Sequence, residues 1–131
     1  MKSQNLFLLF CIMVFFGCIT PGNKNSDGRI QSFIPGTYIR SFAGEYSKGN
    51  DTLFINQPNE SNNYYLIEHR SSYQKIRDKK ILPIEYKSEN WIAIFNETDN
   101  VLVEQKNGKL ISFLEDENAL LLGNSRFNKI K

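Results

Sequence analysis

The chain has 131 residues, two cysteines, 23% charged residues and a formal net charge of +2. This length allows one small domain, and a charge so close to neutrality argues against a nucleic-acid-binding surface. The mixed composition excludes a disordered or low-complexity chain, and a single histidine leaves little material for a metal site, so we expect no cofactor and no metal.

The chain opens with an apolar segment. Lys2 precedes a run from Leu6 to Gly17 that contains no charged residue and no proline. A transmembrane helix needs about 20 residues, so this run is too short to span a bilayer. A positive start, a short apolar run and a small residue at its end form a secretory signal peptide, which we predict over residues 1–17. The alternative, a buried core helix, would need a larger protein around it.

Cys18 follows this run directly. The residues Phe15, Phe16, Gly17 and Cys18 resemble the lipobox of bacterial lipoproteins, in which a small residue precedes a cysteine that receives a diacylglyceryl group. The two Phe residues depart from the usual Leu and small residue. The resemblance implies an exported protein that is lipid-anchored in the cell envelope at Cys18. In this family, Asp directly after the cysteine retains the protein at the inner membrane. Ile19 occupies that position here, so the resemblance implies the outer membrane. The alternative is a chance cysteine beside an ordinary cleavage site.

A polar segment separates the predicted anchor from the rest of the chain. Residues 18–32 are rich in Asn, Gly, Ser and Thr, a composition typical of a flexible tether. We therefore expect one folded domain over residues 33–131. Because Cys11 would be removed with the signal peptide, the mature chain can form no internal disulfide, and its apolar core must hold the fold.

Short apolar runs, divided by Gly, Asn, Asp, Pro and Ser, fill the predicted domain. Runs of this length without a helical period predict strands. We expect them at residues 37–43, 51–56, 63–70, 72–77, 81–87, 91–96, 100–105, 109–114, 119–122 and 126–130. Asn107 and Gly108 lie between two of these runs and favour a hairpin with a type I′ turn.

Alternation along these strands predicts which residues face inward. They are Leu53, Ile55, Tyr65, Ile67, Leu82, Ile84, Tyr86, Trp91, Ala93, Phe95, Ile111 and Phe113. Successive hairpins imply an antiparallel meander, and closing the sheet removes its unpaired edges. We predict an all-β domain of about 8–10 short strands that forms a closed or nearly closed barrel.

The start of the domain carries a family resemblance. Gly36, Thr37 and Tyr38 resemble the Gly-x-Trp start of lipocalin-type barrels, with Tyr in place of Trp. The succession of short hairpins is similar to that of small lipocalin-like bacterial lipoproteins. This resemblance implies a lipocalin-like barrel and no particular activity.

Catalytic chemistry has little support in the sequence. No nucleophile motif is visible, and His69 serves either as a cavity-lining base or as a structural histidine. The acidic run at residues 115–117 fits a solvated loop better than a calcium site. The basic stretch at residues 75–80 either contacts anionic head groups or an acidic partner, or it keeps a turn soluble.

Aromatic residues are the remaining candidates for a binding face. Tyrosine offers rigid, amphipathic contact area, but it is also an ordinary strand residue. The candidates are Tyr64, Tyr65, Tyr73, His69 and Trp91, with one ring of the Tyr64 and Tyr65 pair inside and one outside. We expect a non-catalytic interaction or inhibitor-type module with an envelope protein partner. The alternative is a carrier or sensor of a small apolar ligand.

The predicted anchor can be tested by mass. The membrane-extracted protein should begin at Cys18 and carry the added mass of its acyl chains. A Cys18→Ala variant should lack that mass and leave the membrane fraction. Intact-mass spectrometry of both proteins makes the comparison, and an unmodified wild-type chain that starts elsewhere would contradict the anchor.

Overall fold

The computed structural model describes residues 27–131, so the predicted signal peptide and Cys18 lie outside the described residues. The described chain contains helix α1 (Asp27–Phe33), the 3-10 helix η1 (Glu115–Glu117) and nine strands. The strands are β1 (Gly36–Ala43), β2 (Ser47–Asn56), β3 (Tyr64–Arg77), β4 (Lys80–Ile81), β5 (Glu85–Asn96), β6 (Val101–Glu104), β7 (Leu110–Leu114), β8 (Ala119–Leu122) and β9 (Ser125–Lys129).

Eight of these strands close into an antiparallel barrel. Each strand in the series β1, β2, β3, β5, β6, β7, β8 and β9 pairs with the next. β9 then returns to β1 by pairing Lys129 with Tyr38 and Asn128 with Ile39. The predicted all-β, antiparallel, lipocalin-like barrel is therefore confirmed. β4 adds to it by pairing with the far end of β3.

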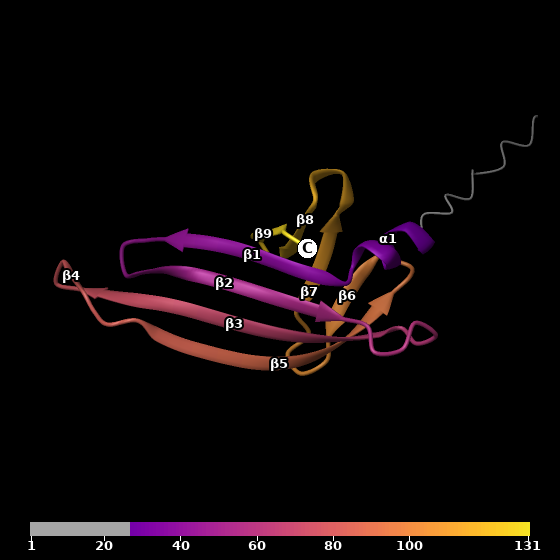
Figure 1. Ribbon diagram of the computed structural model, residues 1–131, viewed down its shortest axis with the longest axis horizontal. Helices are drawn as coiled ribbons and strands as arrows, with labels where there is room; N and C mark the ends of the chain where they lie inside the picture. Colours follow the sequence, from indigo (N-terminus) through magenta and orange to yellow (C-terminus); the bar gives the residue numbers. More distant parts are fainter. Residues whose placement is uncertain (1–26) are drawn as a thin grey trace, which may run out of the picture.

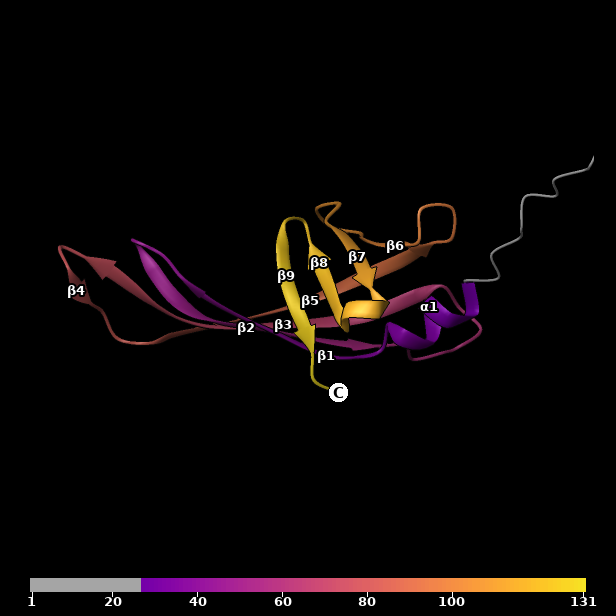
Figure 2. The ribbon, with the colours of Figure 1, turned by 90° about the horizontal axis from the view of Figure 1, so that it is seen from above.

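Four strands are longer than the barrel requires. β1, β2, β3 and β5 have 8, 10, 14 and 12 residues, whereas β6 to β9 have 4 or 5. β1 leaves β9 after Ile39, and β5 meets β6 only from Ala93 onward. The remaining lengths, residues 40–51 and 70–89, continue as an open sheet that we call the arm. The arm projects from the barrel at the end of the long axis opposite α1 (Figure 1 and Figure 2).

Packed side chains fill the interior of the barrel. The buried cluster consists of Ile34, Tyr38, Leu53, Ile55, Tyr65, Ile67, Trp91, Ala93, Phe95, Leu102, Ile111, Leu120 and Phe127. Phe113 is partly buried and packs against this cluster. Alternation therefore identified most of the core, because within the barrel one face of each strand is buried.

Helix α1 covers one end of this interior. Ile30, Phe33 and Ile34 have the spacing of one helix face and pack on the core. The hydroxyl of Tyr38 donates to the carbonyl oxygens of Ile34 at 2.9 Å and of Phe33 at 3.0 Å. The ammonium of Lys129 also donates to the Phe33 carbonyl. Regular structure thus begins inside the segment assigned to the tether, before the predicted boundary at residue 33.

Two predicted gaps between strands are absent. The strands expected at residues 63–70 and 72–77 form the single strand β3, and most of those expected at 81–87 and 91–96 merge into β5. Both strands pass into the arm, and polar residues at the expected gaps, such as the half-buried Ser71 and the exposed Ser88, do not interrupt the ladder. The polar positions that suggested breaks therefore mark the end of the core rather than the end of a strand.

One interruption remains between β4 and β5. Ile81 pairs with Ile76, but Glu85 pairs with Tyr73, so this strand has one residue more than β3 over the same stretch. The extra residue makes a bulge, and Pro83 lies within it, where its missing N–H removes no ladder hydrogen bond.

The prediction that Leu82, Ile84 and Tyr86 face the core is wrong. Leu82 is half-buried, and Ile84 and Tyr86 are 52% and 79% exposed. These residues belong to the arm and its bulge, beyond the level at which the barrel wall surrounds the strands.

The turn assignments also differ from prediction. The hairpin of β6 and β7 is confirmed, but only Gly108 of its Asn107 and Gly108 pair has a positive φ, so the predicted type I′ turn is wrong. Asp78 and Lys79, between β3 and β4, have φ values of 50° and 62°. A type I′ turn requires a positive φ at both central residues, and this pair meets that requirement.

The β6–β7 loop is built around a buried carboxylate instead. Glu104 is fully buried and accepts backbone hydrogen bonds from Lys106 at 2.7 Å, Asn107 at 2.9 Å and Lys109 at 3.4 Å. Burial alone would raise the pKa of Glu104, but these N–H donors outweigh it and hold the pKa below its ordinary value.

Replacing this carboxylate should weaken the fold in a pH-dependent way. We expect Glu104→Gln to lower the free energy of unfolding by about 1–3 kcal/mol at pH 7. A carboxyl whose pKa is depressed by folding stabilises above its unfolded pKa and loses that contribution as pH falls through the folded value. The difference between wild type and variant should therefore shrink in acid.

Thermal unfolding followed by circular dichroism at pH 7 and at pH values below about 4, the ordinary range of a Glu carboxyl, makes this measurement. The exposed Glu97, in the β5–β6 loop, supplies a matched control, and Glu97→Gln should leave the midpoint nearly unchanged. A constant difference between wild type and Glu104→Gln across this pH range would show that the carboxylate charge does not support the loop.

Candidate functional site

The predicted binding residues divide between the two faces of the sheet. Tyr65, His69 and Tyr73 follow one another at intervals of four residues on β3 and lie on its inner face, and Trp91 is opposite the inward-facing Ile67. Tyr65 and Trp91 are 1% and 5% exposed and belong to the core. Tyr64 lies on the outer face and is half-buried. One ring of the tyrosine pair is thus inside and one outside, and the predicted residues form no single exposed face.

A polar cluster lies on the inner face where the barrel passes into the arm. Asp51 on β2 is 8% exposed and accepts hydrogen bonds from Arg40 Nη2 at 2.9 Å and from the hydroxyl of Ser71. His69 Nε2 lies 3.4 Å from the same carboxylate. We call Arg40, Asp51, His69 and Ser71 the junction cluster. Arg40 also donates to Ser125 on β9 at 2.9 Å, so the cluster connects four strands.

The junction cluster contains Ser, His and Asp but lacks the geometry of a catalytic triad. Ser71 Oγ and Asp51 Oδ1 both approach His69 at Nε2, at 3.2 Å and 3.4 Å. In a triad the carboxylate holds the other ring nitrogen, which frees the first to take the serine proton. Here Ser71 donates its proton to Asp51 directly. The arrangement therefore fixes strand positions and does not activate the hydroxyl.

Metal binding has no support in the described part of the chain. Within residues 27–131 no group of three or more His, Cys, Asp and Glu side chains is placed to hold a metal ion. The acidic run at 115–117 forms η1, where Glu117 pairs with Arg126 at 3.1 Å.

An open hollow lies beyond the junction cluster on the arm. Phe42, Gly49 and Tyr73 are directly opposite one another on β1, β2 and β3. Together with Ile84 they line a hollow of about 290 Å³, which we call the arm hollow. A Cβ atom at position 49 would overlap the carbonyl oxygen of Ser72, so the close approach of β2 and β3 requires glycine there.

Trp91 connects the barrel interior with the junction cluster. Its ring centre lies 5.0 Å from that of His69 and 4.3 Å from the ammonium of Lys109. The indole N–H donates to Glu89 at 3.1 Å, and Glu89 pairs with Lys87 at 3.0 Å. Hydrogen bonds from Lys87 and then from Trp91 hold the pKa of Glu89 below its ordinary value. The tryptophan is therefore held from several sides rather than free to bind.

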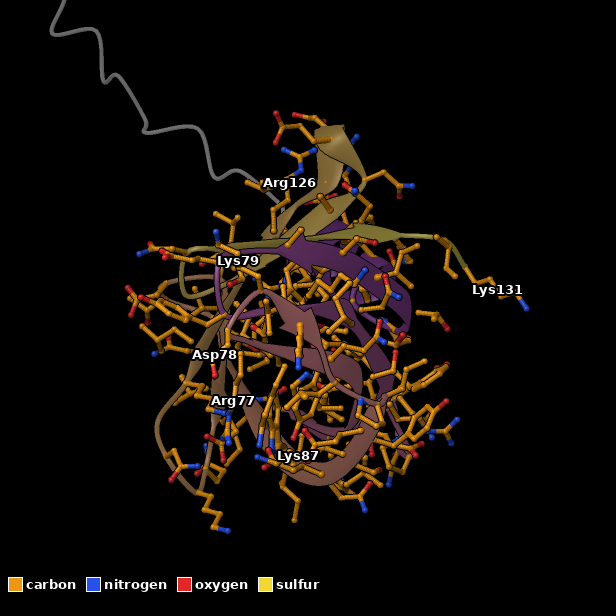
Figure 3. The ribbon with its side chains drawn as sticks, turned by 90° about the vertical axis from the view of Figure 1, so that its left-hand side faces the viewer. Arg77, Asp78, Lys79, Lys87, Arg126 and Lys131 are labelled. Carbon is orange, nitrogen blue, oxygen red and sulfur yellow. The ribbon has the colours of Figure 1, made fainter. Side chains whose placement is uncertain are left out.

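The end of the arm combines exposed apolar residues with basic ones. Tyr46 and Ile81 are 75% and 54% exposed, and they lie in one row because Ile76 hydrogen-bonds to Tyr46 and pairs with Ile81. The basic stretch is next to them. We call Tyr46, Arg77, Lys79, Lys80 and Ile81 the arm tip. Figure 3 views the molecule from this end and labels Arg77 and Lys79 beside Asp78.

Sequence reasoning identified Tyr73 and the basic stretch but missed Arg40, Asp51 and Ser71. Each of these three is an unremarkable polar residue in its own strand. A signal was present, because each occupies an inward position in the period-two pattern, two to four residues from a buried apolar one. The pairing register was needed to bring them together.

Comparison of the chain with models of known protein families, with curated proteins and with solved structures finds no match. In the part of the chain that the structure describes, no helix has the length and apolar character needed to cross a membrane.

Removing the central carboxylate of the junction cluster should destabilise the domain. Asp51→Ala leaves Arg40, whose side chain is only 29% exposed, without its counter-charge. We expect the free energy of unfolding in urea to fall by about 3 kcal/mol.

The exposed pair of Glu68 and Arg70, at 2.6 Å, offers a matched control. Glu68→Ala should cost less than about 1 kcal/mol, because exposed ion pairs contribute little. Equal losses for the two variants would mean that the junction cluster is no more than a surface ion pair.

Proposed function

We propose that this protein is a non-catalytic, lipid-anchored envelope protein that binds a partner protein through its arm. The observation that carries the proposal is the arm itself. It is a four-stranded sheet that extends beyond the barrel, carries the arm hollow and ends in exposed apolar and basic side chains. Four of the large exposed apolar residues lie on the arm, Tyr46, Ile81, Ile84 and Tyr86, and exposed apolar patches are typical of interaction sites.

The direction of the arm supports this use. The described chain begins at α1, and the arm tip lies at the opposite end of the long axis (Figure 1). A chain anchored at Cys18 would enter the domain through α1. The anchor would then hold the barrel near the membrane and direct the arm away from it, where a partner can be reached.

The chemistry of the arm tip indicates an acidic partner surface. Residues 75–80 contain four basic residues and one acidic residue, next to Tyr46 and Ile81. Tyrosine and arginine are enriched in protein interfaces, and complementary charge accelerates encounter. The arm hollow, at about 290 Å³, is at the lower limit of small-molecule sites and is open, so it fits a single projecting side chain of a partner.

A ligand carrier is the second candidate. The hydroxyl of Tyr65 is buried without a hydrogen-bond partner among the described residues, and a polar group of a ligand in the barrel would satisfy it. Against this, aromatic and aliphatic side chains occupy the interior around it, among them Trp91, Phe95 and Phe127. The packing therefore favours the interaction module.

Site-specific photocrosslinking in intact cells tests the proposal. A benzophenone amino acid placed at Tyr46 or Ile81 should give a discrete protein adduct, because both side chains project from the arm tip. Leu110 and Ile130, which are 52% and 54% exposed on the barrel, are the matched control sites. Reversing the charges with Lys79→Glu and Lys80→Glu should reduce the adduct severalfold.

The proposal fails if the barrel sites crosslink as readily as the arm tip, or if charge reversal leaves the adduct unchanged. A small molecule that co-purifies with the intact protein at a fixed mass would instead support the carrier.

A further inference from the structure

In the arm, β5 has an unpaired edge, which the strands of a closed barrel lack. β5 pairs with β3 over Tyr73↔Glu85 to Tyr64↔Ile94, but with β6 only from Ala93 to Asn96. Residues 85–91 of β5 therefore have no strand on their second side within the described chain. An unpaired edge of this length is a template for another strand.

The backbone groups that point to this edge can be identified. Ile92 accepts a hydrogen bond from Gln105 on the β6 side, and Phe95 donates one to Asn63 on the β3 side. Backbone polar groups of successive strand residues point to alternate sides, so those of Tyr86, Ser88 and Asn90 point to the open edge. All three residues are exposed.

We propose that two copies of this chain pair through these edges, antiparallel and centred on Ser88. Ser88 is the midpoint of residues 85–91, so this register uses the whole open edge. Ser88 then faces Ser88 of the other copy, and Tyr86 faces Asn90 of the other copy. In each of these pairs the backbone N–H and C=O groups that point to the open edge face those of the other copy. The two arms form one continuous sheet with a two-fold axis.

The side chains are complementary in this register. Lys87 of each copy faces Glu89 of the other, which gives two opposite-charge contacts across the axis. On the outer face Tyr86, 79% exposed, comes opposite Asn90 of the other copy and would lose water contact on pairing.

Neighbouring registers are less favourable. Centring the pair on residue 87 or 89 places Lys87 against Lys87, or Glu89 against Glu89, and like charges directly opposite one another are destabilising. Centring on Tyr86 shortens the pairing, because regular pairing with β3 begins at Glu85 and Pro83 has no N–H. Centring on Asn90 would require a stretch of β5 that β6 already occupies.

The β6–β7 loop limits how far a second copy can extend along this edge. The β6–β7 loop approaches the Asn90 end of the edge, but a hollow of about 230 Å³ lies there between Glu89–Trp91 and Lys106–Asn107. The interface is one strand wide, so we expect a weak dimer in solution and a larger dimer fraction when both chains share a membrane. The arm tip stays free. The pairing itself does not depend on the proposed function, whereas the larger dimer fraction at a membrane rests on the proposed lipid anchor.

Charge reversal tests whether Lys87 and Glu89 support self-pairing or instead keep this edge from pairing with other strands. Sedimentation velocity of the full chain in excess detergent micelles, at up to about 0.5 mM, should show a concentration-dependent dimer. Lys87→Glu and Glu89→Lys should each raise the dissociation constant of the dimer about tenfold or more, because each places like charges in both contacts. An equimolar mixture of the two variants should restore the dimer, since opposite charges then meet again.

Arg70→Glu is the matched control, because Arg70 is an exposed basic residue on β3, a strand paired on both sides. It should leave dimerisation unchanged. Far-UV circular dichroism establishes that every variant is folded. A wild-type protein that stays monomeric over the whole range, or two folded variants whose mixture stays monomeric, overturns the inference. A monomer that instead incorporates an added peptide strand at β5 would assign the edge to another protein.

Discussion

The pairing of β1 with β9 determines the shape of this molecule. Its ladder ends at Ile39, so residues 40–43 of β1 have no strand on that side and continue as open sheet. The same tyrosine bonds to the carbonyl groups at the end of α1, so one residue closes both the wall and the end of the barrel. The arm follows from a mismatch of lengths, because four short strands cannot accompany four long ones.

Side-chain chemistry changes where the barrel wall ends. Along β2, Leu53 is buried in the core, Asp51 lies in the junction cluster, and Gly49 lies in the arm hollow. A carboxylate with so little exposure is stable only when partners compensate its lost hydration. β1 and β3 supply these partners, and Arg40 extends the connection to β9. The cluster therefore holds the long strands together at the level where the short strands leave them.

The sequence predicted the all-β barrel and most of its core, because burial of one strand face imposes a period of two on residues such as Leu53, Ile55 and Phe95. It did not predict the arm, since strand length beyond the core leaves no apolar pattern. Helix α1 was missed because its few apolar residues lie in a polar segment. The junction cluster was missed because Arg40, Asp51 and Ser71 are far apart in sequence, and only the register aligns them.

Trp91 is the single tryptophan of the chain. Its indole lies between His69, Lys109 and Glu89 at the level where the closed wall ends and the open sheet begins. All indole fluorescence of the protein therefore originates at this boundary, beside groups whose charge or movement can quench it. The molecule therefore carries an optical reporter of this boundary, which needs no added dye.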